Sequence, residues 1–182
     1  MEFEIKLEEY HSASAFDFDP QDIVESEVVE HPDPTNERSA ARRVALQTLY
    51  EVDSAGHAIE IVLQQQLAAH VLTEKTRSYL QQLVMGVMEN RQRLDKAIQQ
   101  FAPEWPLEQV AIIDRNILRL AIYEFAIFLR TPVGVAIDEA VELGKLFGAE
   151  GTPRFINGVL GALADDPLAL QQLLENGTEK LS

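Results

Sequence analysis

Three arginines close to residue 40 are the side chains in this chain best suited to chemistry, and that chemistry is anion binding. Arg38, Arg42 and Arg43 lie in the segment RSAARRVALQTLYEVD, and Arg38 and Arg42 share one face of the helix that this segment predicts. We expect the helix to begin near Arg38, where its macrodipole disfavours cations by roughly 0.3–1 kcal/mol. This unfavourable placement indicates an external anion, and phosphate is the natural candidate. The alternative is an ordinary solvated helix face.

The other polar residues do not form a recognisable catalytic or metal site. The four histidines lack the spacing of metal ligands, and residues 144–151 have no Gly-Lys-Ser/Thr of a phosphate-binding loop. Asp138, Glu139 and Glu142 could provide paired carboxylates, but no nucleophile accompanies them, and an exposed helix face explains them equally well. The absence of cysteine excludes disulfides, zinc-thiolate sites and a thiol nucleophile. These observations favour a binding protein, without catalytic residues, metal or cofactor, over an enzyme.

Negative charge is concentrated at the start of the chain. Of the net charge of -15, residues 1–36 carry -10, with eleven Asp/Glu and one Lys, and residues 37–182 carry only -5. The near-balance of the second part removes much of the objection to nucleic-acid binding that the total charge raises. We expect residues 1–36 to be a disordered, solubilising extension. A second interpretation is that the rings and carboxylates of residues 16–19 mimic nucleic acid at the protein's own basic site.

Residues 107–129 form the longest apolar stretch, and they predict a buried central helix. Apolar residues recur there at steps of three and four around most of the helix, so neighbours must pack against most of its sides. Its charged residues argue against a membrane span. Pro103 and Pro106 prevent an earlier start, and Pro132 follows its end. Trp105, between the two prolines, is expected to fill the core beside this helix.

The rest of the chain predicts further helices and no strand after residue 36. Apolar periodicity places them over residues 38–53, 59–71, 74–88, 91–101, 133–147 and 154–163. We expect Thr73 and Thr152 to be helix caps, and Gly86 to allow a close crossing or a bend. The predicted fold class is therefore all-α, a bundle of about seven helices. Its parts are the extension 1–36, a helical domain over residues 37–165, and a tail over residues 166–182 that is a polar helix or a frayed end. No secretory signal precedes them, so we expect a cytoplasmic protein.

Three segments carry a resemblance to a known family. RSAARRVALQTLYEVD, DRNILRLAIYEF and VAIDEAVELGKLFGAEGTPRFINGVLGAL resemble, in order and spacing, the NusB family of transcription antitermination factors. The similarity covers about residues 38–165. It implies two packed helical subdomains and no enzyme activity.

The resemblance also implies ligands. The family binds the boxA element of ribosomal RNA leaders together with NusE, a small-subunit ribosomal protein. This heterodimer joins NusA, NusG and RNA polymerase and suppresses termination, and some family members form homodimers. Carried over to this chain, the RNA-binding residues are Arg38, Arg42, Arg43, Arg154 and Phe155, and the NusE-binding residues are Tyr50 and Asp114. An arginine beside an aromatic ring suits single-stranded RNA, because bases stack on the ring while phosphates pair with the cation.

The chain departs from the family pattern in two ways. The family's first helix often begins with a longer arginine run and has Arg-Glu where this chain has Arg42-Arg43, so RNA affinity is expected to be modest without a partner. The acidic extension is not part of the usual pattern, and we expect it to compete with RNA for the arginines. Two alternatives remain: a helical protein-protein adaptor without RNA binding, and a detached N-terminal domain of an rRNA cytosine methyltransferase. The given sequence shows neither the cofactor domain nor the catalytic cysteines of those enzymes, which argues against the methyltransferase alternative.

Overall fold

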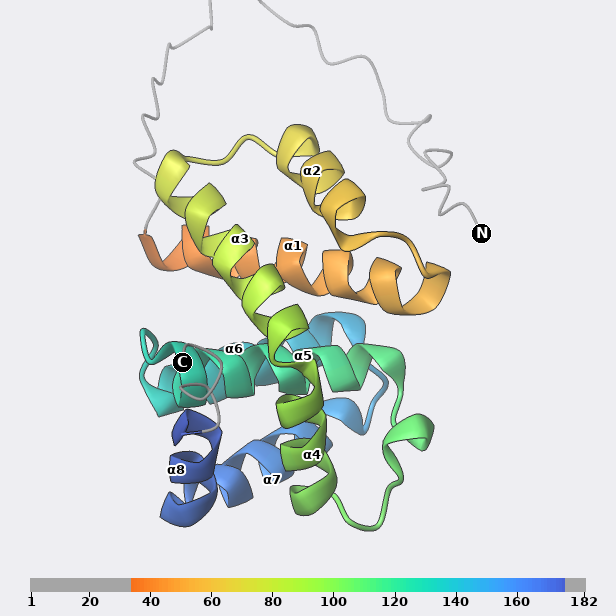
Figure 1. The fold of residues 1–182 in the computed structure, drawn as a ribbon, viewed down its shortest axis with the longest axis vertical. Coiled ribbons are helices and arrows are strands. Elements are labelled where there is room, and N and C mark those ends of the chain that lie inside the picture. Colours follow the sequence, from red (N-terminus) through yellow and green to blue (C-terminus); the bar gives the residue numbers. More distant parts are fainter. Residues whose placement is uncertain (1–33, 176–182) are drawn as a thin grey trace, which may run out of the picture. The chain divides into compact units, whose positions relative to one another are not determined.

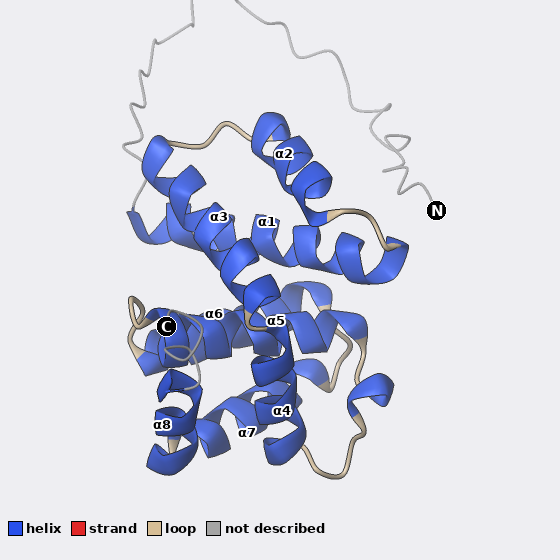
Figure 2. Ribbon diagram, viewed as in Figure 1, coloured by secondary structure: helices blue, strands red, loops and turns tan. Residues whose placement is uncertain are grey.

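The part of the chain that the structure describes, residues 34–175 of a computed structural model, is helical throughout and has no strand (Figure 1 and Figure 2). The chain divides into two units, residues 1–31 and 32–182, and all described residues belong to the second. The predictions for the acidic extension lie almost entirely outside the described residues. The α-helices are α1 (Pro34–Ala55), α2 (Ile59–Ala69), α3 (Glu74–Glu89), α4 (Arg91–Phe101), α5 (Ile112–Ile122), α6 (Val133–Phe147), α7 (Thr152–Ala164) and α8 (Pro167–Glu175). The all-α prediction is confirmed.

Helix α5 is the centre of the bundle, as the apolar stretch predicted. Helices α1, α3, α4, α6 and α7 all pack against it, and every residue from Asn116 to Ile122 is buried. Helices α1, α2 and α3 pack on one another, whereas α4 and α6 pack with α7 on the other side of α5 (Figure 1). None of the described helices is long and apolar enough to cross a membrane.

The predicted single helix over residues 107–129 is in fact three elements. A 3-10 turn, η1 (Leu107–Gln109), is followed by extended backbone at Val110 and Ala111 before α5 begins. Polar side chains hold this turn, because Gln99 Oε1 accepts the Leu107 N–H and Arg115 donates to the Leu107 carbonyl. After Ile122 the helix widens into a π-helical turn, η2 (Tyr123–Phe128).

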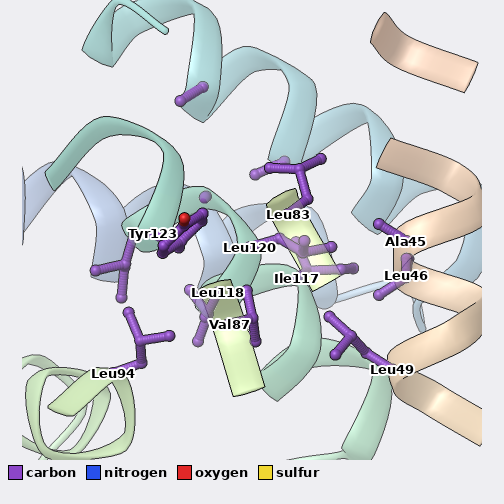
Figure 3. Close-up of a cluster of buried hydrophobic side chains, with 14 of the residues drawn as sticks. Ala45, Leu46, Leu49, Leu83, Val87, Leu94, Ile117, Leu118, Leu120 and Tyr123 are labelled. Carbon is purple, nitrogen blue, oxygen red and sulfur yellow. The ribbon is translucent and has the colours of Figure 1, made fainter. Parts of the chain in front are cut away.

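The core lies between α1, α3 and α5 and continues toward α4. Leu46 and Leu49 of α1 point toward Ile117 and Leu120 of α5, with Leu83 of α3 beside them (Figure 3). All five are buried, as expected for interdigitating apolar faces.

Gly86 confirms the expectation of a close crossing. A Cβ at this position would lie 2.0 Å from Cζ of Tyr123, whose ring packs against the backbone of α3. Only a residue without a side chain leaves room for that ring.

Two local predictions, for Trp105 and Thr152, were wrong, and the cap at Thr73 was predicted correctly. Trp105 is 53% exposed, because it lies in the turn between α4 and η1, where Gln99 donates a hydrogen bond to its backbone carbonyl. Thr152 is the first residue of α7 rather than its cap; its hydroxyl accepts the Ala149 N–H and donates to Asp114. Thr73 is the N-cap of α3, since its hydroxyl oxygen accepts the Thr76 N–H.

Residues 167–175, within the predicted C-terminal tail, form the packed helix α8. The Asp166 carboxylate accepts the N–H groups of Leu168 and Ala169 and so caps the beginning of α8. Ala169 and Leu173 of α8 are buried against the bundle.

Candidate nucleic-acid interface

Two of the three predicted arginines on α1 are available to a ligand. Arg38 and Arg43 are exposed on α1, and neither has a carboxylate partner among the described residues. The Arg38 guanidinium carbon lies 5.6 Å from the centroid of the Tyr79 ring on α3. This cation–π contact orients Arg38 while leaving its outer side free.

Arg42 is in a different environment, because it is buried and already paired. It is 3% exposed, and its Nε and Nη2 donate to the two carboxylate oxygens of Glu124 at 2.8 and 2.9 Å. Its Nη1 lies 3.2 Å from a carboxylate oxygen of Glu139 on α6. The anion that faces Arg42 is therefore part of the protein, and Arg42 joins α1 to η2 and α6.

The helix macrodipole does not act on these arginines in the way that the sequence suggested. Helix α1 begins at Pro34, four residues before the expected start, so Arg42 and Arg43 lie in its third turn. The effect of the macrodipole on a charge fades within the first turn. The case for an anion site at Arg38 and Arg43 depends instead on their exposure and on the absence of a carboxylate partner within residues 34–175.

Glu124 is the residue that organises this end of the bundle, and its role was not predicted from the sequence. Besides Arg42, its carboxylate accepts hydrogen bonds from the hydroxyls of Tyr79 and of Thr131, the latter at 2.7 Å. Burial, and then the negative charge of Glu124, raise the pKa of Tyr79, so the phenol stays protonated and donates. Burial alone would lower the pKa of Arg42, but the hydrogen bond and charge of Glu124 outweigh it and raise that pKa. The sequence did contain one signal for this role. Glu124 lies inside an apolar stretch, and a carboxylate buried there requires a cationic partner.

The second group of predicted residues lines a depression beside the start of α7. Arg154, Phe155 and Asp114 surround it together with Trp105, and its volume is about 820 Å³. Asp114 is half-buried and accepts a hydrogen bond from the Thr152 hydroxyl at 2.9 Å. Burial raises the pKa of Asp114, and the Thr152 hydrogen bond partly opposes that shift. The structure thus brings a residue predicted for NusE binding together with two predicted for RNA binding.

The two groups lie toward opposite ends of α5. Helices α1 and α5 run antiparallel, because Arg42 meets Glu124 after the end of α5 while Asp53, eleven residues later on α1, meets Asn116 near its start. Arg38, one turn before Arg42 on α1, therefore lies beyond the end of α5, whereas Asp114 lies in the first turn of α5. Helix α5, along which the two groups are separated, is about 16 Å long. Tyr50, which is 44% exposed, lies on the part of α1 nearer to Asp53 and hence to the Asp114 end.

The described residues define an all-helical bundle protein that exposes arginines on α1. Within residues 34–175 no three histidine or acidic side chains could together hold a metal ion. The chain belongs to the NusB family, whose family model matches residues 39–165.

Relatives and solved structures agree with this assignment. The chain is 47% identical over 130 residues to the transcription antitermination protein NusB of Dehalococcoides mccartyi (strain CBDB1), covering 71% of this chain and 91% of the relative. It is 39% identical over 142 residues to the NusB protein of Chloroflexus aggregans, covering 77% and 95%. These relatives are named as transcription antitermination proteins and not as enzymes, in agreement with the prediction of a protein without enzyme activity.

Among solved structures, a NusB from T. maritima superposes with a TM-score of 0.67 at 28% identity, over 74% of this chain and 96% of that one. A structure of NusB and NusE in complex with double-stranded RNA superposes with a TM-score of 0.63 at 26% identity, over 70% and 95%.

Proposed function

We propose that this protein is a transcription antitermination factor that binds boxA RNA of ribosomal RNA operons as a heterodimer with NusE. The observation that carries the proposal is the family match over residues 39–165, joined to the exposed arginines of α1. The solved NusB–NusE complex with RNA supports the pairing of these two ligands. Assembly with NusA, NusG and RNA polymerase follows from the same proposal, as does a location in the cytoplasm, where that polymerase acts.

The residue roles follow from accessibility. Arg38 and Arg43 contact RNA phosphates from α1, and Arg154 does so from the start of α7, with Phe155 as a stacking platform. Arg42 has a structural role. Its ion pair with Glu124 holds α1 in place, and so positions the backbone that carries Arg38 and Arg43. Tyr50 and Asp114 contact NusE at the other end of α5.

A binding measurement with both ligands tests this function. We expect the full chain to bind a boxA RNA more tightly with NusE than without it. Affinity should fall with salt by a slope of roughly 0.7 in log K per log salt for each phosphate neutralised on a single strand. Tyr50→Ala should weaken NusE binding about tenfold, as is typical for an interface tyrosine, whereas Gln47→Ala, at another exposed position on α1, should leave it unchanged.

The same experiment separates the alternatives. Binding to NusE with no salt-sensitive RNA binding in any combination would support a protein-protein adaptor. The rRNA methyltransferase alternative has less support, because relatives matched over 91% and 95% of their own lengths are named as antitermination proteins.

A further inference from the structure

Beside Arg38, the structure places cationic and aromatic side chains together in a row. We call Arg38, Tyr79, Phe128 and Arg130 the arginine–aromatic strip. The Arg38 guanidinium carbon is 5.6 Å from the Tyr79 ring centroid, the Tyr79 and Phe128 centroids are 6.4 Å apart, and the Arg130 guanidinium carbon is 5.5 Å from the Phe128 centroid. The four residues come from α1, α3, η2 and the loop before α6. Phe128 and Arg130 are close in the sequence, but only the fold brings them beside Tyr79 and Arg38.

The rings of the strip are fixed from beneath. The Tyr79 hydroxyl donates to the buried carboxylate of Glu124. The Phe128 ring stacks on Tyr123, with centroids 5.6 Å apart and an angle of 11° between the ring planes. Both rings are half-buried, and they therefore form a rigid base for the two guanidinium groups.

The two guanidinium groups form the outer layer of the strip. Arg38 and Arg130 are exposed, and neither has a carboxylate partner among the described residues. A guanidinium held against a ring keeps its N–H edges available to phosphate and its outer face available for stacking. This combination suits a single-stranded nucleic acid, in which bases stack on planar groups while the backbone needs cations.

An unusual backbone conformation precedes Arg130. Leu129 has φ of +54°, the left-handed region that a bulky residue rarely adopts, and its side chain is 60% exposed. Leu129 terminates η2 at the point where the chain turns toward Arg130. A left-handed residue is a common way to end a helix, and here it directs the chain from Phe128 to Arg130.

We infer that the arginine–aromatic strip binds single-stranded RNA, with Arg130 as an additional phosphate and stacking contact beyond the arginines of α1. This inference rests on the proposed RNA-binding function and extends it to Arg130, which is not among the arginines predicted from the sequence. It also predicts the path of the RNA, which leaves Arg38 across α3 and η2 toward the start of α6.

The test uses the full chain with NusE and a fluorescently labelled single-stranded boxA RNA, measured by anisotropy over a salt series. Arg130→Ala should weaken binding about five- to tenfold at low salt and reduce the salt slope by roughly 0.7. Arg130→Lys should keep the salt slope but weaken binding about threefold, because an ammonium group cannot stack as a planar group does. Lys96→Ala, which removes an exposed cation from α4, is the matched control and should leave affinity unchanged.

Each outcome decides a different question. If the unmodified chain binds RNA with NusE but Arg130→Ala binds equally well, the strip is not an RNA contact, while the proposed function stands. If Lys96→Ala weakens binding as much as Arg130→Ala, the effect is one of net charge and the inference fails. If the unmodified chain with NusE does not bind RNA, the proposed function itself fails, and the inference fails with it.

Discussion

The guanidinium of Arg42 and the carboxylate of Glu124, 82 residues apart in the chain, form a two-hydrogen-bond ion pair whose side chains are only 4% and 2% exposed. Tyr79, Thr131 and Glu139 complete the polar surroundings of this pair. An arginine expected at the RNA surface is thus an internal structural element.

Arg42→Ala should destabilise the fold, because it leaves the Glu124 carboxylate buried without its cation. Removing one partner of such a pair costs about 3–5 kcal/mol. Urea unfolding followed by circular dichroism should detect this loss, and Arg43→Ala on the neighbouring exposed position should change stability by less than about 0.5 kcal/mol. An Arg42→Ala protein of unchanged stability that no longer bound RNA would mean that Arg42 contacts RNA directly.

Arg38→Ala and Arg43→Ala should affect RNA binding but not folding. Each substitution removes an exposed cation, so the salt slope of RNA binding should fall by roughly 0.7 for each phosphate that the variant no longer neutralises. Titrations at several salt concentrations, with the urea midpoint measured in parallel, provide both readings. Equal salt slopes for these variants and the unmodified chain would exclude α1 as the phosphate-binding helix.

Asp114→Asn should make stability less dependent on pH. Burial raises the pKa of Asp114 in the folded protein, so ionisation of this carboxyl opposes folding once the pH rises above its ordinary value of 3.8. Asparagine keeps an acceptor for the Thr152 hydroxyl without that cost. At pH 7 the variant should be at least as stable as the unmodified chain, and its advantage should vanish below the ordinary pKa. A less stable variant at pH 7, measured by urea unfolding, would show that the charged form is favoured instead.

Gly86→Ala should destabilise the packing of α3 on η2. The added Cβ would lie 2.0 Å from the buried ring of Tyr123, so the ring or the helix must move, at a cost of about 1–3 kcal/mol. Gly161→Ala in α7 is the control, because nothing lies within 4 Å of its Cβ position. There the better helix propensity of alanine should raise stability by up to about 1 kcal/mol. Thermal unfolding of both variants should show shifts in opposite directions.

Deleting residues 1–33 should strengthen RNA binding at low salt. The deletion removes eleven Asp/Glu and one Lys, a net charge of -10, and leaves α1 intact. If the acidic segment competes for Arg38, Arg43 and Arg154, the gain should disappear as salt screens the attraction. Anisotropy titrations of both chains with labelled RNA provide the comparison, and identical affinities at low salt would rule out the competition.

The apolar pattern was sufficient to predict most of the fold. Steps of three and four identified the central stretch and its burial, and Thr73 marked the start of α3. The pattern could not distinguish an α-helix from the 3-10 turn before it or the π-helical turn after it, since all three keep apolar residues on nearly the same side. Those details depend on tertiary contacts such as the hydrogen bond between Gln99 and Leu107.

The site was harder to predict than the fold, because the exposure of each arginine depends on residues that are distant from it in the sequence. Arg38 and Arg42 share one helix face in the sequence, but the two carboxylates that pair with Arg42 come from Glu124 and Glu139, more than 80 positions later. The prediction placed Trp105, between two prolines, in the core beside the central helix, yet it is 53% exposed. The sequence places Arg130 two residues after Phe128, but only the fold brings Tyr79, and with it Arg38, beside that ring.

The ion pairs of α1 also favour one orientation of α1 relative to α5. Along α1, Arg42 pairs with Glu124, and Asp53, eleven residues later, pairs with Arg119 in the last turn of α5 at 2.7 Å. In the opposite orientation of α1, Arg42 would come toward Arg119 and Asp53 toward Glu124, so like charges would be buried near one another. The charge pattern therefore selects against the reversed topology, a discrimination that apolar packing alone does not provide.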